Sequence, residues 1–183
     1  MNPVFAASRS MGWSWMYARD NKEKEARSAL SAAGKDFDRA GLGDAQRVVR
    51  TLGVNSADNA QGIADGFHQQ IQPALAKKDL KRYHAASAGW CLGLAERGCS
   101  LMTKHKDSAE AKKAIDKWLT VARDETDALR TQKLVPGMKN FTADFKNCLG
   151  CIHAVTDPTQ WKHLCDCGSL IENLANQVGN AIP

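Results

Sequence analysis

The stretch AASAGWCLGLAERG, residues 85–98, decides the fold of this chain. It lies in a segment that reads as one long helix from about residue 79 to residue 104, and its side chains are unusually small. Each glycine in a helix costs about 1 kcal/mol relative to alanine, so tertiary packing has to offset the three in this stretch. Small residues let backbones approach closely. We therefore expect this helix to be the one most enclosed by its neighbours.

The rest of the chain repeats apolar side chains every three or four residues and shows no sustained alternation of β-branched and polar residues. Regular helices are predicted over residues 22–40, 44–52, 56–72, 79–104, 108–134, 138–155 and 158–182. The sequence therefore predicts an all-α protein, a single bundle of six or seven helices. Val135-Pro136-Gly137 is expected to separate a main bundle, residues 1–135, from a C-terminal antiparallel helical hairpin, residues 138–183, within one domain.

The composition is that of an ordinary globular protein. Of the 183 residues, 43% are hydrophobic and 25% are charged, which is enough for a sizeable core without disulfide support. The first residues lack the charged flank and apolar core of a secretory signal, and no apolar run approaches the length of a membrane span. We therefore expect a cytoplasmic protein with no membrane partner, whose six cysteines are thiols or metal ligands and not disulfides.

Cysteine and histidine are concentrated in CLGCIH, residues 148–153, and HLCDC, residues 163–167. Residues three or four apart share one face of a helix. Across an antiparallel hairpin, same-face pairs then give a candidate structural zinc site of the Cys3His type, formed by Cys148, Cys151, His163 and Cys167. If the last helix begins later, Cys165 or His153 replaces one member of this set. Buried core thiols, with no cofactor, are the simpler interpretation, and a redox or disulfide role is the third.

The net charge of +5 is concentrated in the middle of the chain. Residues 1–76 carry 9 basic and 8 acidic side chains, whereas residues 77–135 carry 13 and 8. The basic side chains form two groups, Lys77, Lys78, Lys81 and Arg82, and then Lys104, Lys106, Lys112, Lys113 and Lys117. They are candidate contacts to nucleic-acid phosphates. The alternative is a solvated face partly neutralised by acidic neighbours, and antiparallel helices would put the two groups at opposite ends.

The N-terminal segment around residues 11–17 holds two of the five tryptophans but lies outside the strongest periodic pattern. Two interpretations remain open. It is a short helix docked on the bundle, or it is an arm that anchors to a partner. Tryptophan and tyrosine dominate interface hot spots, so the candidate partner interface consists of Trp13, Trp15, Met16 and Tyr17.

No phosphate-binding glycine loop, nucleophile elbow or paired zinc-protease motif occurs in the sequence. The leading hypothesis is therefore a non-catalytic helical interaction or structural subunit of a larger assembly, with a protein partner or self-association. The first alternative is a nucleic-acid-associated subunit that contacts phosphates through residues 77–82 and 104–117. The second is a small protein with the structural zinc site.

Overall fold

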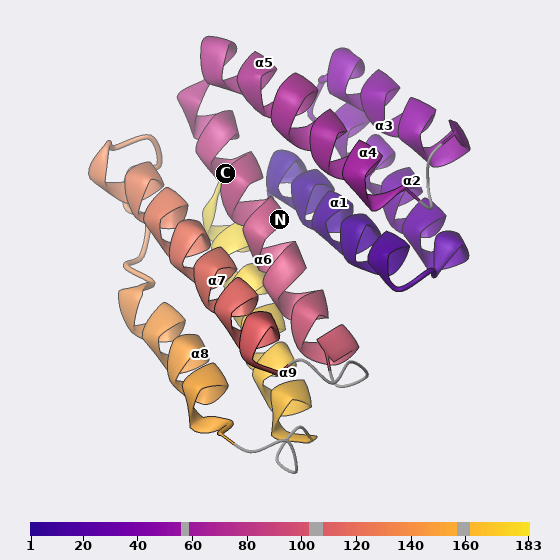
Figure 1. Ribbon diagram of the computed structural model, residues 1–183. Helices are drawn as coiled ribbons and strands as arrows, with labels where there is room; N and C mark the ends of the chain where they lie inside the picture. Colours follow the sequence, from indigo (N-terminus) through magenta and orange to yellow (C-terminus); the bar gives the residue numbers. More distant parts are fainter. Residues whose placement is uncertain (56–58, 103–107, 157–161) are drawn as a thin grey trace.

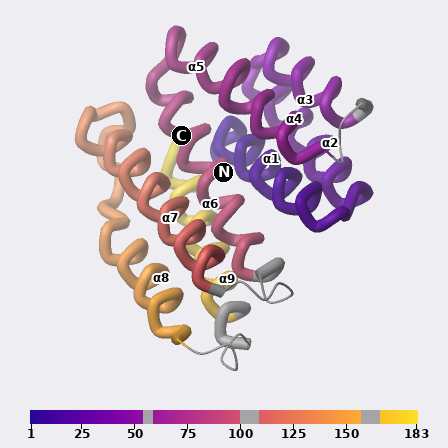
Figure 2. Tube along the Cα trace, in the orientation of Figure 1, coloured from indigo at the N-terminus to yellow at the C-terminus, as the bar shows by residue number. Residues whose placement is uncertain are grey.

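The computed structural model describes residues 1–55, 59–102, 108–156 and 162–183, apart from a few side chains at the helix ends beside the gaps (Figures 1 and 2). Within these ranges the chain is all-helical and has no strand, as predicted. The helices are α1 (Pro3–Arg19), α2 (Glu23–Arg39), α3 (Gly43–Asn55), α4 (Ala60–Asp65), the π-helix η1 (Gly66–Ile71), α5 (Gln72–Lys78), α6 (Leu80–Met102), α7 (Ser108–Thr131), α8 (Thr142–Ala154) and α9 (Lys162–Ala181).

The N-terminal segment is a long helix inside the fold, so the interpretation as an arm is wrong. The Asn2 side chain accepts hydrogen bonds from the Val4 and Phe5 amides at 3.0 Å, which caps the first turn of α1. α1 then packs against α6 on one side and α2 on the other. Because polar residues such as Ser8 and Ser14 are also buried, the helix lacks the one-sided apolar stripe by which sequence reasoning finds amphipathic helices.

The centre of the molecule is the contact between α1 and α6, here called the α1–α6 seam and defined by Gly12, Gly89 and Gly93. A Cβ built at Gly12 would stand 2.6 Å from the Trp90 carbonyl oxygen, and one at Gly89 or Gly93 would come closer still to the backbone of α1. The two backbones are therefore in direct contact. Residues 85–96 of α6 are all buried, which confirms that this helix is the most enclosed part of the fold.

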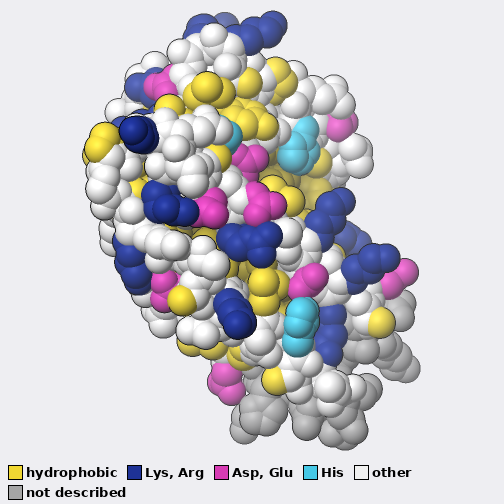
Figure 3. Space-filling view, turned by 90° about the vertical axis from the view of Figure 1, so that its left-hand side faces the viewer, with side chains coloured by type: hydrophobic (Ala, Val, Ile, Leu, Met, Phe, Trp, Pro, Cys, Tyr) yellow, Lys and Arg dark blue, Asp and Glu magenta, His cyan; other side chains and the backbone are white. Residues whose placement is uncertain are grey.

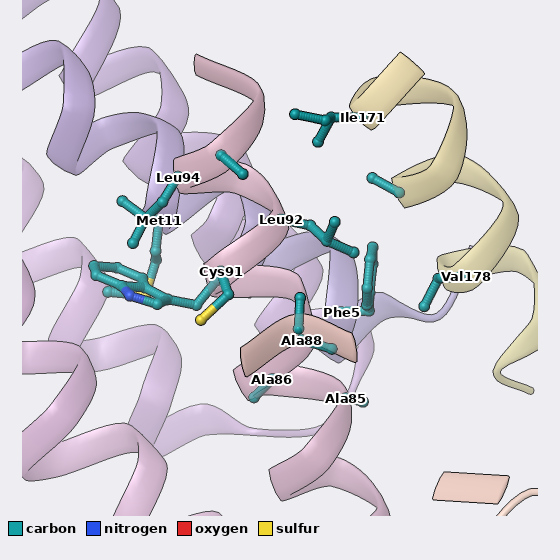
Figure 4. Packing of buried hydrophobic residues seen from close by; sticks show 14 of the residues in the cluster. Phe5, Met11, Ala85, Ala86, Ala88, Cys91, Leu92, Leu94, Ile171 and Val178 are labelled. Carbon is teal, nitrogen blue, oxygen red and sulfur yellow. The ribbon is translucent and has the colours of Figure 1, made fainter. Parts of the chain in front are cut away.

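α9 closes the core on the far side of the seam. Figure 4 shows Phe5 of α1 and Leu92 of α6 pointing toward α9, where Ile171 and Val178 lie. The two ends of the chain also meet there, because the Asn2 amide donates to the Gly179 carbonyl at 2.7 Å. The N and C labels accordingly lie close together in Figure 1.

A buried polar network crosses the same core. Arg9 of α1 donates from Nε and Nη2 to Glu96 Oε2 of α6, at 3.0 and 2.8 Å, and both side chains are about 5% exposed. Trp13 Nε1 donates to the same oxygen at 3.2 Å, and Arg9 Nη1 donates to Asn176 of α9 at 2.8 Å. A buried charge pair must be fully hydrogen-bonded to be tolerated, so this network ties α1, α6 and α9 in one arrangement.

The helix predicted over residues 56–72 is divided into α4 and η1. Because of this division and the additional helix α1, the described part of the chain has more helices than the six or seven that we predicted. Pro73 lacks an amide donor and cannot sit in the middle of an unbroken α-helix without losing a hydrogen bond. Before it the chain widens into the π-turn η1, in which the Gln72 amide donates to the Phe67 carbonyl five residues back. Pro73 then falls in the first turn of α5, where no donor is missed.

Candidate functional site

The cysteine and histidine cluster takes a different form from the proposed zinc set. Cys151 of α8 and Cys167 of α9 form a disulfide, with Cα atoms 5.7 Å apart. The expectation that all cysteines are thiols or ligands is therefore wrong for these two. The register between the two helices brings Cys151 level with Cys167. Residue spacing alone does not determine disulfide connectivity.

Of the other two members of the set, the structure describes the side chain of Cys148 alone. Cys148 is buried at 3% exposure, and burial, followed by the nearby Asp144 carboxylate, raises the pKa of its thiol to about 11. The side chains of His163 and Cys165 lie outside the described residues. In the described part of the chain, no group of three or more potential ligands could hold a metal ion. Zinc binding stays a prediction, and it requires reduction of the disulfide, because a disulfide sulfur is not a thiolate ligand.

The basic residues remain two separate groups. Lys77 and Lys78 are exposed at the end of α5, while Lys81 and Arg82 are half-buried at the start of α6. Arg82 is paired with Asp79, at 3.3 Å between Nε and Oδ2.

On α7, Lys113 and Lys117 are exposed, Lys112 is half-buried, and Lys104 and Lys106 lie outside the described residues. His84 near the start of α6 contacts Glu125 near the end of α7 at 2.5 Å, so the two helices are antiparallel. The described lysines Lys113 and Lys117 therefore lie roughly 15–20 Å from Arg82 along the helix axes. Figure 3 shows basic and acidic side chains interspersed over the face that it presents.

The aromatic residues of α1 are engaged inside the protein. Met16 is 5% exposed, and the other three are half-buried. The Arg97 guanidinium lies 4.8 Å from the Trp13 ring centroid and 5.8 Å from that of Tyr17, while Trp15 packs edge-on against Trp118 of α7. A role in a partner interface stays a prediction for these residues.

Sequence reasoning missed an open groove between α2 and α3. It has a volume of about 620 Å³, within the range typical of ligand-binding clefts. Its floor consists of small and apolar residues: Leu30 and Gly34 from α2, with Val49 and Gly53 from α3. Figures 1 and 2 place these two helices at the edge of the bundle, on the side of α1 away from α7 and α8. This surface is called the α2–α3 groove below.

Four basic side chains stand around the floor: Arg27, Lys35 and Arg39 of α2, and Arg50 of α3. Asp38 is the one carboxylate among the described lining residues. Arg27 and Arg39 are each paired with a carboxylate on their own helix, Glu23 at 2.7 Å and Asp36 at 3.0 Å.

Lys35 and Arg50 make no ion pair with any residue that the structure describes, and both are exposed. The groove therefore presents free positive charge beside an apolar surface. A second, smaller cavity of about 310 Å³ borders the α2–α3 turn and has only Asp44 and Lys78 as charged lining residues.

The sequence contains a weak indication of the groove in the spacing of residues on α2. Leu30, Gly34, Lys35 and Asp38 are spaced to share one face of α2. Over residues 1–76, however, the 9 basic and 8 acidic side chains nearly cancel, and a regional count hides which helix face each of them occupies.

No protein-family model, curated protein or solved structure matches this chain. No helix within the described ranges is both long and apolar enough to cross a lipid bilayer. The chemistry of the α2–α3 groove is accordingly the basis of the functional proposal.

Proposed function

We propose that this protein is a non-catalytic interaction or structural subunit of a larger assembly, and that the α2–α3 groove is its binding surface. The architecture proposed with it is one helical bundle, residues 1–135, with residues 138–183 as a C-terminal antiparallel hairpin. Its cytoplasmic location stays a prediction, which the disulfide between Cys151 and Cys167 weakens, because such bonds persist mainly in oxidising compartments.

The observation that carries the proposal is the combination, in one place, of an open cleft, a small-residue floor and two cations that have no ion pair with a described residue. Lys35 and Arg50 attract a ligand of negative charge, and the lining of the groove is partly apolar. Leu30 and Val49 close its floor and are each 1% exposed. Binding sites commonly combine an apolar surface with a few placed polar groups. The polar network around Glu96, by comparison, lies inside the core and presents no open cleft to a substrate.

Site-directed photo-crosslinking tests the proposal. A photoreactive amino acid replaces Ser31, which lines the groove, and in a matched control it replaces Ser28, which is exposed on the same helix outside the groove. Irradiation in native extract should give a discrete adduct at position 31 that is absent at position 28. The adduct should also disappear when Lys35→Glu and Arg50→Glu are added. Equal labelling at both positions, or no adduct together with a strict monomer in light scattering, contradicts the proposal.

Nucleic-acid binding through residues 77–82 and 104–117 stays the second candidate, favoured by the exposure of Lys77, Lys78, Lys113 and Lys117. It predicts affinity for oligonucleotides that falls steeply as salt is added. Charge reversal at Lys113 and Lys117 that leaves oligonucleotide affinity unchanged contradicts it.

A further inference from the structure

The α2–α3 groove is elongated along the helix axes. Its lining on α2 runs from Arg27 to Arg39, about 18 Å at the rise of an α-helix, and on α3 from Gln46 to Gly53, about 10 Å. Arg27 also reaches across to the Gly53 carbonyl of α3, which bounds one end. The cleft is thus a trough of about three helical turns, with one helix on each side and its open side toward solvent.

Two positions of the floor are glycines, which have no side chain to fill the trough. A Cβ built at Gly34 would lie 3.9 Å from Cγ1 of Val49 on α3, and a Cβ built at Gly53 would lie 3.8 Å from Cβ of Leu30 on α2. Two neighbouring helices with one open side present a surface on which side-chain ridges of a third helix can pack. An inserted helix would therefore place its apolar side chains over these glycines.

The rim determines the charge of the occupant. Lys35 on α2 and Arg50 on α3 line the groove from its two helices and make no ion pair with a described residue. Arg27 and Arg39, toward the two ends, are each paired with a carboxylate of their own helix. Asp38 adds one negative charge to the lining, so the excess positive charge comes from Lys35 and Arg50. The long aliphatic stems of these residues also widen the apolar surface. An occupant with apolar residues on one face and carboxylates placed against Lys35 and Arg50 would complement these two cations and the apolar part of the lining.

We propose that the α2–α3 groove binds an acidic amphipathic helix of a partner protein. Docking of an amphipathic helix in a groove is an established recognition mode, with anchors at positions i, i+3 or i+4, and i+7. The partner helix has at least three turns, or about 12 residues, and carries aspartate or glutamate on both flanks of its apolar face. This inference rests on the proposed function, since it names the occupant of the same surface. A nucleic acid would use the cations but not the apolar floor.

The test uses the purified full-length protein and two synthetic peptides of the same composition. One peptide places leucines at helical spacing with glutamates on both flanks, and the other has the same residues in scrambled order. Fluorescence anisotropy should show saturable binding of the first peptide and at least tenfold weaker binding of the second. Circular dichroism should show that the first peptide gains helix on binding.

Variants then locate the binding. Lys35→Glu with Arg50→Glu should weaken the helical peptide about tenfold or more. The matched control, Lys24→Glu with Arg47→Glu, makes the same charge change at exposed positions of the same two helices outside the groove, and should change affinity less than twofold. Ser31→Trp should block the groove without added charge, whereas Ser28→Trp should not.

Each contrary result has its own meaning. Equal binding of the scrambled peptide, or equal losses in groove and control variants, overturns the proposal in favour of general charge attraction. Stronger groove-dependent binding of a single-stranded oligonucleotide overturns it in favour of a nucleic acid. If the position 31 adduct forms in extract and the helical peptide does not compete with it, the partner class is wrong and the proposed function stands. If no such adduct forms and the protein is a strict monomer in light scattering, the proposed function itself fails.

Discussion

In the α1–α6 seam a Cβ built at Gly12 would meet the Trp90 carbonyl oxygen at 2.6 Å, whereas in the α2–α3 groove a Cβ at Gly34 would meet only the Val49 side chain, at 3.9 Å. The first distance lies well inside van der Waals contact with rigid backbone. The second is ordinary contact with a movable methyl group. Glycine therefore closes one helix pair completely and leaves an open floor between the other, which no count of glycines in the sequence distinguishes.

Charge follows the same division. In the core beside the seam, Arg9 and Glu96 are hydrogen-bonded to each other and about 5% exposed. Their charges therefore neutralise each other inside the protein and are not accessible to a ligand. In the groove, Lys35 and Arg50 stay exposed and unpaired among the described residues. We expect the seam to contribute mainly to stability and propose that the groove contributes to binding. Substitutions at matched positions can separate these two roles.

Glu96→Ala should have the largest effect. It leaves the Arg9 guanidinium buried without its carboxylate partner and removes the acceptor of the Trp13 indole. We expect a loss of about 4 kcal/mol in the free energy of unfolding, measured by urea denaturation. Asp44→Ala is the control, because the ion pair of Asp44 with Arg47 is over 80% exposed and should contribute less than about 0.5 kcal/mol. Similar losses in the two variants would contradict the assignment of stability to the core network.

Gly93→Ala should be nearly as damaging, although it adds only one methyl group. That methyl would collide with the backbone of α1 at Arg9, so the two helices must move apart along the seam. We expect a loss of about 3 kcal/mol in the same denaturation measurement. A near-native urea midpoint would contradict this expectation. So would a crystal structure of the variant in which α1 is not displaced.

Removal of the disulfide tests the side of the molecule opposite the groove. Cys151→Ser with Cys167→Ser opens a covalent loop with a sequence separation of 16, so the free energy of unfolding should fall by about 2–3 kcal/mol. A reductant should destabilise the wild-type protein by a similar amount and have no effect on the double variant. Affinity for the acidic helical peptide should stay unchanged in both cases, because the groove lies on other helices.

The buried thiol of Cys91 should make the free energy of unfolding depend on pH in the alkaline range. Burial, with a smaller effect of Glu125 that outweighs Lys117, raises the pKa of this thiol from 9.0 to about 12. The folded protein therefore holds the thiol proton more tightly than the unfolded chain does. This stabilisation is complete below pH 9 and is lost between pH 9 and pH 12, by about 1 kcal/mol at pH 10. Cys91→Ala should lose that part of the alkaline decline, and an identical decline in both proteins would contradict this cause.

The sequence predicts the amphipathic helices and the small-residue helix α6 well, and α1 poorly. α2 and α9 begin and end within a few residues of their predicted limits, because each buries one clear apolar stripe, such as Leu30 and Phe37 in α2. α1 was left uncertain because it is buried on several faces, with serines among the buried residues. Its position depends on contacts with α6, more than 70 residues away in sequence, which no local pattern encodes.

The candidate sites were less predictable than the fold, for two physical reasons. The bond between Cys151 and Cys167 depends on the register between α8 and α9, and a shift of one turn changes which residues meet. The groove depends on which faces of α2 and α3 the charges occupy after packing. Lys35 and Arg50 are 15 positions apart and become a pair of opposing cations only because the two helices are antiparallel.

Gly34→Ala should have the smallest effect on stability and separates the two roles most cleanly. The added methyl group meets Val49 at an ordinary contact distance, and alanine favours a helix over glycine by about 1 kcal/mol, so the free energy of unfolding should rise by no more than about that amount. The same methyl group raises the floor of the groove and should weaken the acidic helical peptide several-fold in the anisotropy measurement. A stable variant with reduced affinity, set against Gly93→Ala, would show that glycine serves packing in the seam and access in the groove. A marked loss of stability would instead mean that the α2–α3 contact is as tightly closed as the seam.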